Sequence, residues 1–177
     1  MNILITKNEI QTRISEMASE IDAYYLSQEW YRHSQEPVIV IGVLTGAVFF
    51  MADLVRKLSI RTKIDFMKVE SYEGTSSHEP MILSEPRILL HDAHILLVDD
   101  ILDKGKTLNE ITKHLFRPWP ENVRVAVLLR KKVDRAFDIR PKFVGFDVPD
   151  EFVVGYGLDY NDSYRQLPYI ATLGREI

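Results

Sequence analysis

The amino-acid sequence predicts an α/β fold with a parallel, twisted sheet flanked by helices. Three largely apolar runs, at residues 38–43, 95–98 and 123–129, have the composition of strands that are buried on both faces of a sheet. Segments with helical spacing of apolar residues separate these runs, and strands joined through helices pair in parallel. The chain has 177 residues, of which 46% are hydrophobic, which suffices for one domain with its own core. We therefore expect residues 1–177 to form a single domain.

The first helix is predicted to begin at a capping box and to end near Tyr31. Thr6 and Glu9 have the spacing at which a hydroxyl and a carboxylate satisfy free amides at a helix start. Pro37 ends this region before the first apolar run. The helix should bury the apolar residues that recur at helical spacing, namely Ile10, Ile14, Met17, Ala18, Ile21 and Tyr25.

The rest of the chain alternates between strand-like and helix-like segments. Helices are predicted at residues 48–58 and 107–116, and a strand at residues 64–69. Residues 71–85, SYEGTSSHEPMILSE, are polar; they read either as an ordinary disordered loop or as a functional one, since long loops in compact domains often carry function. From Lys142 onward, the shorter strand-like pieces KFVGFDV and EFVVGYG predict a small subdomain.

Composition excludes several classes of protein. The net charge of −4 and the pI near 5.7 argue against a surface that binds nucleic acid. Because the chain has no cysteine, it has neither disulfides nor a thiol nucleophile. No apolar run reaches the length of a membrane span, and the start of the chain does not have the pattern of a secretion signal. We expect a cytoplasmic protein whose partners are small molecules rather than membranes.

The stretch ILLVDDILDKGKTL, residues 95–108, ends in GKT as a nucleotide-binding P-loop does. The P-loop pattern requires a glycine five residues before Gly105. Position 100 is an aspartate, and its carboxylate would face the phosphates that the loop is meant to hold. The P-loop interpretation therefore fails at its first position.

A strand, two acids, a loop and a helix start remain, and this order suits a sugar phosphate. Ligands of parallel sheets bind beyond the carboxyl ends of the strands. Asp99 and Asp100 can accept hydrogen bonds from a ribose diol, while Gly105 permits a tight turn before the free amides of a helix. Lys106 and the Thr107 hydroxyl add further donors. The residues favour a ribose 5-phosphate site, and the alternative is an acidic strand end followed by a capped helix.

The same stretch resembles the phosphoribosyl-pyrophosphate signature of the type I phosphoribosyltransferases, a hydrophobic strand, two acids and a D-x-G-x-T phosphate loop. The tail KFVGFDVPDEFVVGYGLDYNDSYRQLPYI is similar, nearly residue for residue, to the C-terminal region of hypoxanthine-guanine phosphoribosyltransferases. GVLTGAVFFMADLVRKL and the pair Ser71-Tyr72 occur in the expected order, so the resemblance covers about residue 38 to the end. It implies the type I fold, with a small hood built from the chain ends.

For the sugar and its phosphates, the resemblance implies a set of ligands and a magnesium cofactor. Asp99 and Asp100 would bind the ribose hydroxyls, directly or through Mg²⁺, and Asp159 would be a ligand of a second Mg²⁺. The loop from Lys104 to Thr107 would wrap the 5-phosphate, and Arg165 would contact pyrophosphate. The implied phosphoribosyl-pyrophosphate site consists of Leu44, Thr45, Gly46, Asp99, Asp100, Lys104, Gly105, Lys106, Thr107 and Arg165.

For the purine, the resemblance implies that Asp103 is the general base near N7 and that Lys131 donates to the 6-oxo group. Phe152 would stack on the base, and Val153 would contact its edge through backbone atoms. On residue type alone, Lys131 lies in a basic turn that solvent could surround, and Phe152 could be part of a core strand. The lid implied by the resemblance spans about residues 71–85 and includes Ser71 and Tyr72.

Two positions depart from the family pattern. Lys104 replaces a threonine that many relatives carry, so one hydroxyl contact to the phosphate is lost. Thr45 replaces a residue that is often basic, so we expect weaker binding of pyrophosphate. In the family, the loop of Leu44, Thr45 and Gly46 contains a cis peptide bond whose backbone meets pyrophosphate, so the side chain there is less critical.

The resemblance implies a purine-salvage enzyme that makes IMP, and GMP if guanine is used, from phosphoribosyl pyrophosphate. It also implies a homodimer or homotetramer. One alternative is a xanthine-guanine phosphoribosyltransferase, and another is an RNA-binding regulator of the same fold, which would need a basic face. A third is a sugar-phosphate sensor without catalysis, which would be expected to lose Asp103 or Lys131; both are present.

Overall fold

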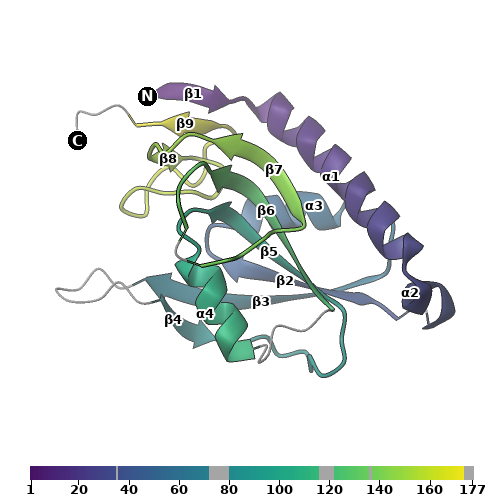
Figure 1. The fold of residues 1–177 in the computed structure, drawn as a ribbon. Coiled ribbons are helices and arrows are strands. Elements are labelled where there is room, and N and C mark those ends of the chain that lie inside the picture. The colour runs from purple at the N-terminus through teal and green to yellow at the C-terminus, as the bar shows by residue number, and fades with distance from the viewer. Residues whose placement is uncertain (35, 72–79, 116–121, 136, 174–177) are drawn as a thin grey trace.

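The computed structural model describes residues 1–34, 36–71, 80–115, 122–135 and 137–173. A six-stranded sheet forms the body, in the order β4-β3-β2-β5-β6-β7, and a three-stranded sheet lies beyond it (Figure 1). The strands of the large sheet are β2 (Val38–Leu44), β3 (Thr62–Ser71), β4 (Pro80–Ser84), β5 (Ile95–Leu102), β6 (Val123–Lys131) and β7 (Phe143–Val148). All neighbours in it are parallel except β3 and β4, which are antiparallel. The predicted α/β fold with a parallel sheet is confirmed.

Helices cover both faces of the large sheet, which explains why its central strands are apolar throughout. Val38 and Val40 of β2 belong to the core beneath α1 (Lys7–Ser27) and α3 (Val48–Val55). Ile39 and Ile41 of the same strand belong to the core beneath α4 (Lys106–Leu115). Successive strand residues point to opposite faces, so each strand contributes to both cores.

The first helix was predicted correctly at its start and too long at its end. The Thr6–Glu9 capping box is present, and all six apolar residues expected on the inner face are buried. The helix ends at Ser27 rather than near Tyr31, because Gln28 has an extended backbone with ψ near 134°. A separate short helix, α2, follows at Glu29–Ser34.

Part of the polar segment at residues 71–85, which was expected to be a loop, belongs to strands in the structure. β3 extends to Ser71, and Pro80–Ser84 form β4, which pairs with β3 at the edge of the sheet. Tyr72 and the rest of residues 72–79 lie outside the described residues. The lid at this position therefore stays a prediction. If it forms, it joins the paired strands β3 and β4.

The hood is the three-stranded sheet, built from both ends of the chain as predicted. β1 (Asn2–Ile5) pairs with β9 (Ile170–Thr172), which pairs with β8 (Val153–Val154), and these strands lie together at the top of Figure 1. β1 was not predicted; it has only four residues and is mostly exposed. The chain between β8 and β9 carries Gly157, Asp159 and Arg165 to the carboxyl ends of β2 and β5.

Among the residues that the structure describes, none of the helices combines the length and apolar character needed to cross a membrane.

Candidate active site

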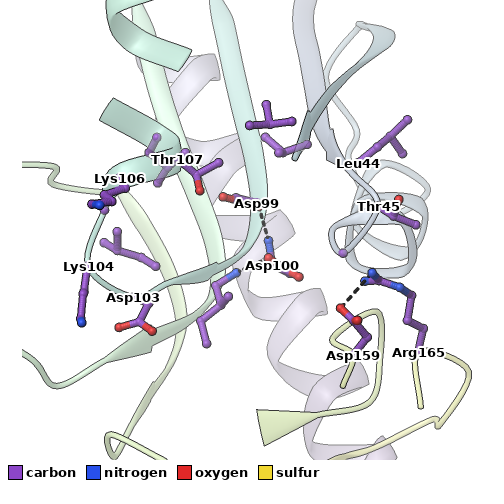
Figure 2. Close-up of a pocket in the computed structure, with 17 residues that line it drawn as sticks. Leu44, Thr45, Asp99, Asp100, Asp103, Lys104, Lys106, Thr107, Asp159 and Arg165 are labelled. Atoms are coloured by element: carbon purple, nitrogen blue, oxygen red, sulfur yellow. Dashed lines mark hydrogen bonds and ion pairs between the residues drawn. The ribbon is translucent and has the colours of Figure 1, made fainter. Parts of the chain in front are cut away.

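A cavity of about 630 Å³ lies where β2 and β5 end. Residues 43–46, at the end of β2 and just after it, and residues 99–108, from the end of β5 into α4, line it, together with Val69, Asp159 and Arg165. Asp99 and Asp100 lie in the middle of the cavity, with the loop that leads to α4 on one side and Leu44 and Thr45 on the other (Figure 2). The ten residues predicted to bind phosphoribosyl pyrophosphate all line this cavity, and so does the predicted metal ligand Asp159.

Asp99 and Asp100 form an acid pair at the carboxyl end of β5, in which Asp99 is buried and Asp100 is partly buried. Asp99 is 6% exposed, and its Oδ1 accepts a hydrogen bond from the Asp100 amide at 3.0 Å. Asp100 Oδ1 accepts from the Ile101 amide at 2.7 Å. Burial raises the pKa of Asp99 well above its usual range, and the nearby charge of Asp100 raises it further. Burial likewise raises the pKa of Asp100. Two acids held this way favour a partner that brings hydroxyl donors or positive charge.

Glycines allow three backbone segments to converge on this acid pair. A Cβ on Gly46 would collide with the carboxylate of Asp100, so any other residue there would displace the Asp100 side chain. Gly157, at a φ of +106°, lies against the carbonyl of Gly46. The peptide bond between Leu44 and Thr45 is cis, as the family resemblance implied. The loop after β2 is thereby held between β5 and the hood.

The phosphate loop has the form that an anion site requires. Gly105 turns the chain at a φ of +83°, and α4 begins at the next residue. The first amides of a helix have no intrahelical acceptor and attract negative charge. Lys104 and Lys106 are exposed at the rim, and Thr107 is partly buried within the cavity. The loop therefore offers amides, a hydroxyl and positive charge at one place.

Arg165 and Asp159 close the opposite side of the cavity as an ion pair. Arg165 Nη2 lies 2.8 Å from Asp159 Oδ1, and Arg165 Nη1 donates to the Gly157 carbonyl at 2.7 Å (Figure 2). The second carboxylate oxygen of Asp159 accepts from the Asp162 amide at 2.9 Å. Asp159 therefore forms an ion pair with Arg165, and a cation bound at Asp159 would compete with this guanidinium.

Asp103 and Lys131 are brought together from the ends of two neighbouring strands. Lys131 Nζ lies 3.0 Å from Asp103 Oδ2 and 3.5 Å from Asp150 Oδ1, and the lysine side chain is 12% exposed. Asp103 Oδ1 is buried and has no hydrogen-bond partner among the described residues. An unpaired buried carboxylate oxygen beside an ammonium group is suited to take a proton from a ligand that the ammonium also contacts.

Phe152 and Val153 lie in the hood, next to this pair but outside the lining of the cavity. Phe152 is 52% exposed, and its ring meets that of Tyr160 edge-on at 5.6 Å. Val153 is buried and pairs with Thr172. Because Asp150 contacts Lys131, the segment that carries Phe152 reaches the same place as the lysine. An exposed ring here argues against the core-strand alternative and is compatible with stacking on a ligand.

The prediction from the sequence did not include three residues that contact the site, namely Gly157, Arg135 and Asp150. Gly157 supports the loop after β2, and Arg135 donates to the carbonyl oxygens of Asp103 and Lys131. Asp150 is a second acid at Lys131. Only Gly157 carried a signal, since a glycine between Tyr156 and Leu158 suggests a turn with positive φ.

The donor set in the cavity fits magnesium bound together with a phosphate ligand. In the described part of the chain, no three His, Asp or Glu side chains are gathered as a preformed metal site. Magnesium typically takes one or two carboxylates and completes its shell with water and substrate phosphates. Asp99, Asp100 and Asp159 supply hard oxygen atoms in a single cavity, so these residues fit the ion without a dedicated cage.

A parallel sheet whose central strand ends in two acids and a phosphate loop, under a hood from the chain ends, defines a phosphoribosyltransferase. The family model for the phosphoribosyl transferase domain matches residues 11–161, and the chain belongs to this family.

Relatives place the chain more narrowly. It is 40% identical to the hypoxanthine-guanine phosphoribosyltransferase of Staphylococcus epidermidis, over 99% of this chain and 95% of that protein. The solved hypoxanthine phosphoribosyltransferase of Staphylococcus aureus is 36% identical with a TM-score of 0.86, covering 98% of this chain and 91% of that one. The Trypanosoma cruzi enzyme in complex with its product IMP is 35% identical with a TM-score of 0.87, covering 100% and 96%.

The buried acid pair predicts a stability that falls as pH rises. A carboxyl whose folded pKa is raised above its unfolded value stabilises the fold below the unfolded pKa, near 3.9, and loses this contribution as pH climbs through the folded pKa. Asp99→Asn removes the titration and keeps an oxygen for the Asp100 amide. The variant should melt several degrees above the wild type at pH 8 without magnesium, and the gain should shrink toward pH 5.

Thermal unfolding between pH 5 and 8 measures this difference. Asp147→Asn is the control, because Arg130 lowers the pKa of that exposed carboxyl and its loss should give no gain at pH 8. Parallel curves of melting temperature against pH for Asp99→Asn and wild type would contradict a raised pKa at Asp99.

Proposed function

We propose that this protein transfers ribose 5-phosphate from phosphoribosyl pyrophosphate to N9 of hypoxanthine or guanine. The products are IMP or GMP and pyrophosphate. The observation that carries the proposal is the Asp103–Lys131 pair, at 3.0 Å, directly beside the acid pair and the phosphate loop. The names of the staphylococcal relatives and the IMP complex of the Trypanosoma cruzi enzyme support the same reaction.

The sugar half of the reaction depends on Asp99 and Asp100. Their carboxylates accept hydrogen bonds from the vicinal hydroxyls of the ribose, while the amides between Lys104 and Thr107 and the Thr107 hydroxyl hold the 5-phosphate. These contacts fix C1 of the sugar in the cavity. As the bond from C1 to pyrophosphate breaks, positive charge develops on the sugar, and the nearby carboxylates favour that charge.

The pyrophosphate lies toward the loop of Leu44, Thr45 and Gly46 in this proposal. Main-chain groups of that loop and the guanidinium of Arg165 contact it, so that Arg165 exchanges Asp159 for the phosphates. Asp99, Asp100 and Asp159 would hold magnesium. When bound, the metal supplies positive charge that offsets the charge of the leaving pyrophosphate.

The purine half depends on Lys131, Asp103 and Phe152. Lys131 donates to the 6-oxo oxygen, and the ring of Phe152 covers one face of the base. N9 forms the new bond to C1 while Asp103 Oδ1, the oxygen without a partner in the described structure, takes the proton from N7. The proton transfer leaves a neutral purine in the nucleotide. Hypoxanthine and guanine share O6 and N7, so this contact set accepts both bases.

A panel of purine bases tests the proposed reaction. With phosphoribosyl pyrophosphate and magnesium, hypoxanthine and guanine should give IMP and GMP, whereas adenine should give no nucleotide because its 6-amino group repels the Lys131 ammonium. Xanthine is the third arm, and a preference for it would assign the xanthine-guanine specificity instead. Chelation of magnesium should stop turnover. Chromatographic separation of the nucleotides measures the products. Full activity in excess chelator would contradict the proposed magnesium-dependent site.

Asp103→Asn separates chemistry from binding. Asparagine keeps the size of the side chain but cannot take the proton, so kcat should fall by roughly 10²- to 10⁴-fold. The KM for phosphoribosyl pyrophosphate should stay near the wild-type value, because Asp103 contacts the purine and not the sugar. Steady-state kinetics with each substrate varied in turn give both constants. A variant that keeps kcat and loses only affinity would show that Asp103 is a structural acid.

A further inference from the structure

Arg135 holds together the two chain segments that carry the purine-recognition groups. Its Nε donates to the main-chain carbonyl of Asp103 at 3.0 Å, and its Nη2 donates to the main-chain carbonyl of Lys131. The arginine side chain is partly buried. Both acceptors are neutral carbonyl oxygens, so the guanidinium acts here as a rigid fork between the ends of β5 and β6.

The side chains alone do not fix the distance between Asp103 and Lys131. A single contact joins Lys131 Nζ to Asp103 Oδ2, and the ammonium sits on a flexible stem that also reaches Asp150 at 3.5 Å. A lysine ammonium is a point charge, whereas a guanidinium presents several donors in one plane. The backbone anchors set by Arg135 therefore determine where the acid and the ammonium can meet a purine.

The segment that carries Arg135 also packs along the phosphate loop. The space that a Cβ on Gly105 would occupy is bounded by Phe137 and Ile139, at 3.8 and 3.7 Å. Lys113 of α4 lies 5.9 Å from the centre of the Phe137 ring. Phe137 and Ile139 therefore lie against the phosphate loop, and Phe137 also lies near α4. These two residues hold the segment that follows Arg135 beside the loop.

We propose that Arg135 is a positioning residue, which sets the spacing of Asp103 and Lys131 to match N7 and O6 of one purine ring. The inference rests on the proposed function of the same site. It predicts that loss of Arg135 harms purine use while the sugar half of the site, built from Asp99, Asp100 and the phosphate loop, keeps its affinity.

Kinetics of Arg135→Ala, Arg135→Lys and Arg140→Ala test the inference. Arg140 is the matched control, since it lies in the same segment, is 84% exposed and pairs only with Asp138 among the described residues. Misplacement of reacting groups by about 1 Å can lower a rate about 100-fold, so kcat/KM for hypoxanthine should fall about 10- to 100-fold in Arg135→Ala. The KM for phosphoribosyl pyrophosphate should change by no more than about twofold.

Two rescues distinguish positioning from general support of the fold. Arg135→Lys keeps the charge but has no fork, so it should recover only part of the loss. Guanidinium chloride at low millimolar concentration should raise hypoxanthine turnover by Arg135→Ala and leave Arg140→Ala unchanged. Equal losses for both substrates, or no response to guanidinium, would overturn the positioning role. Absence of IMP formation by the wild type would instead overturn the proposed function itself.

Discussion

The arrangement of the site follows from a pair of carboxylates at the end of β5, one buried and one partly buried. Asp99 and Asp100 are held by backbone amides, and burial raises the pKa of both. Placing two acids together under a hood destabilises the free protein, and such local cost is typical of sites arranged for a ligand. Gly46 can approach Asp100 only because it lacks a side chain, and Gly157 in turn lies on Gly46. The loop after β2 therefore lies between the acid pair and the hood, with close contacts on both sides.

The register of two parallel strands then connects the sugar half of the site to the purine half. Ile101 pairs with Leu129 and Leu102 with Arg130. The next residues along the chain are Asp103, just after β5, and Lys131, the last residue of β6. The acid that we propose takes the purine proton follows the proposed ribose-binding acids by a few residues in the same chain segment. The lysine that we propose recognises O6 comes from the adjacent strand. A one-residue shift in this pairing would separate the two groups.

Local patterns in the sequence were enough to predict the elements and residues that act close to each other along the chain. The apolar runs, the capping box and the segment from Asp99 to Thr107 carry their own signals, and the structure agrees with them. The end of α1 at Gln28 could not be predicted, because no glycine or proline lies there. β1 and β4 have only four and five residues and are largely exposed, so their apolar residues form no run as long as those of the central strands. The roles of Arg135 and Gly157 arise from contacts between distant segments, which periodicity does not report. The lid near Ser71 and the homodimer or homotetramer remain predictions.

Calorimetric titration of each substrate into two variants tests most directly whether the site is divided into a sugar half and a purine half. The account predicts that Asp99→Asn weakens binding of magnesium and phosphoribosyl pyrophosphate but leaves the binding of hypoxanthine, in the presence of magnesium pyrophosphate, nearly unchanged. Lys131→Met should do the reverse and weaken hypoxanthine at least about tenfold, because a charged hydrogen bond contributes roughly 1.5 to 3 kcal/mol. Equal weakening of both ligands in both variants, or hypoxanthine binding by Lys131→Met with wild-type affinity, would contradict the account.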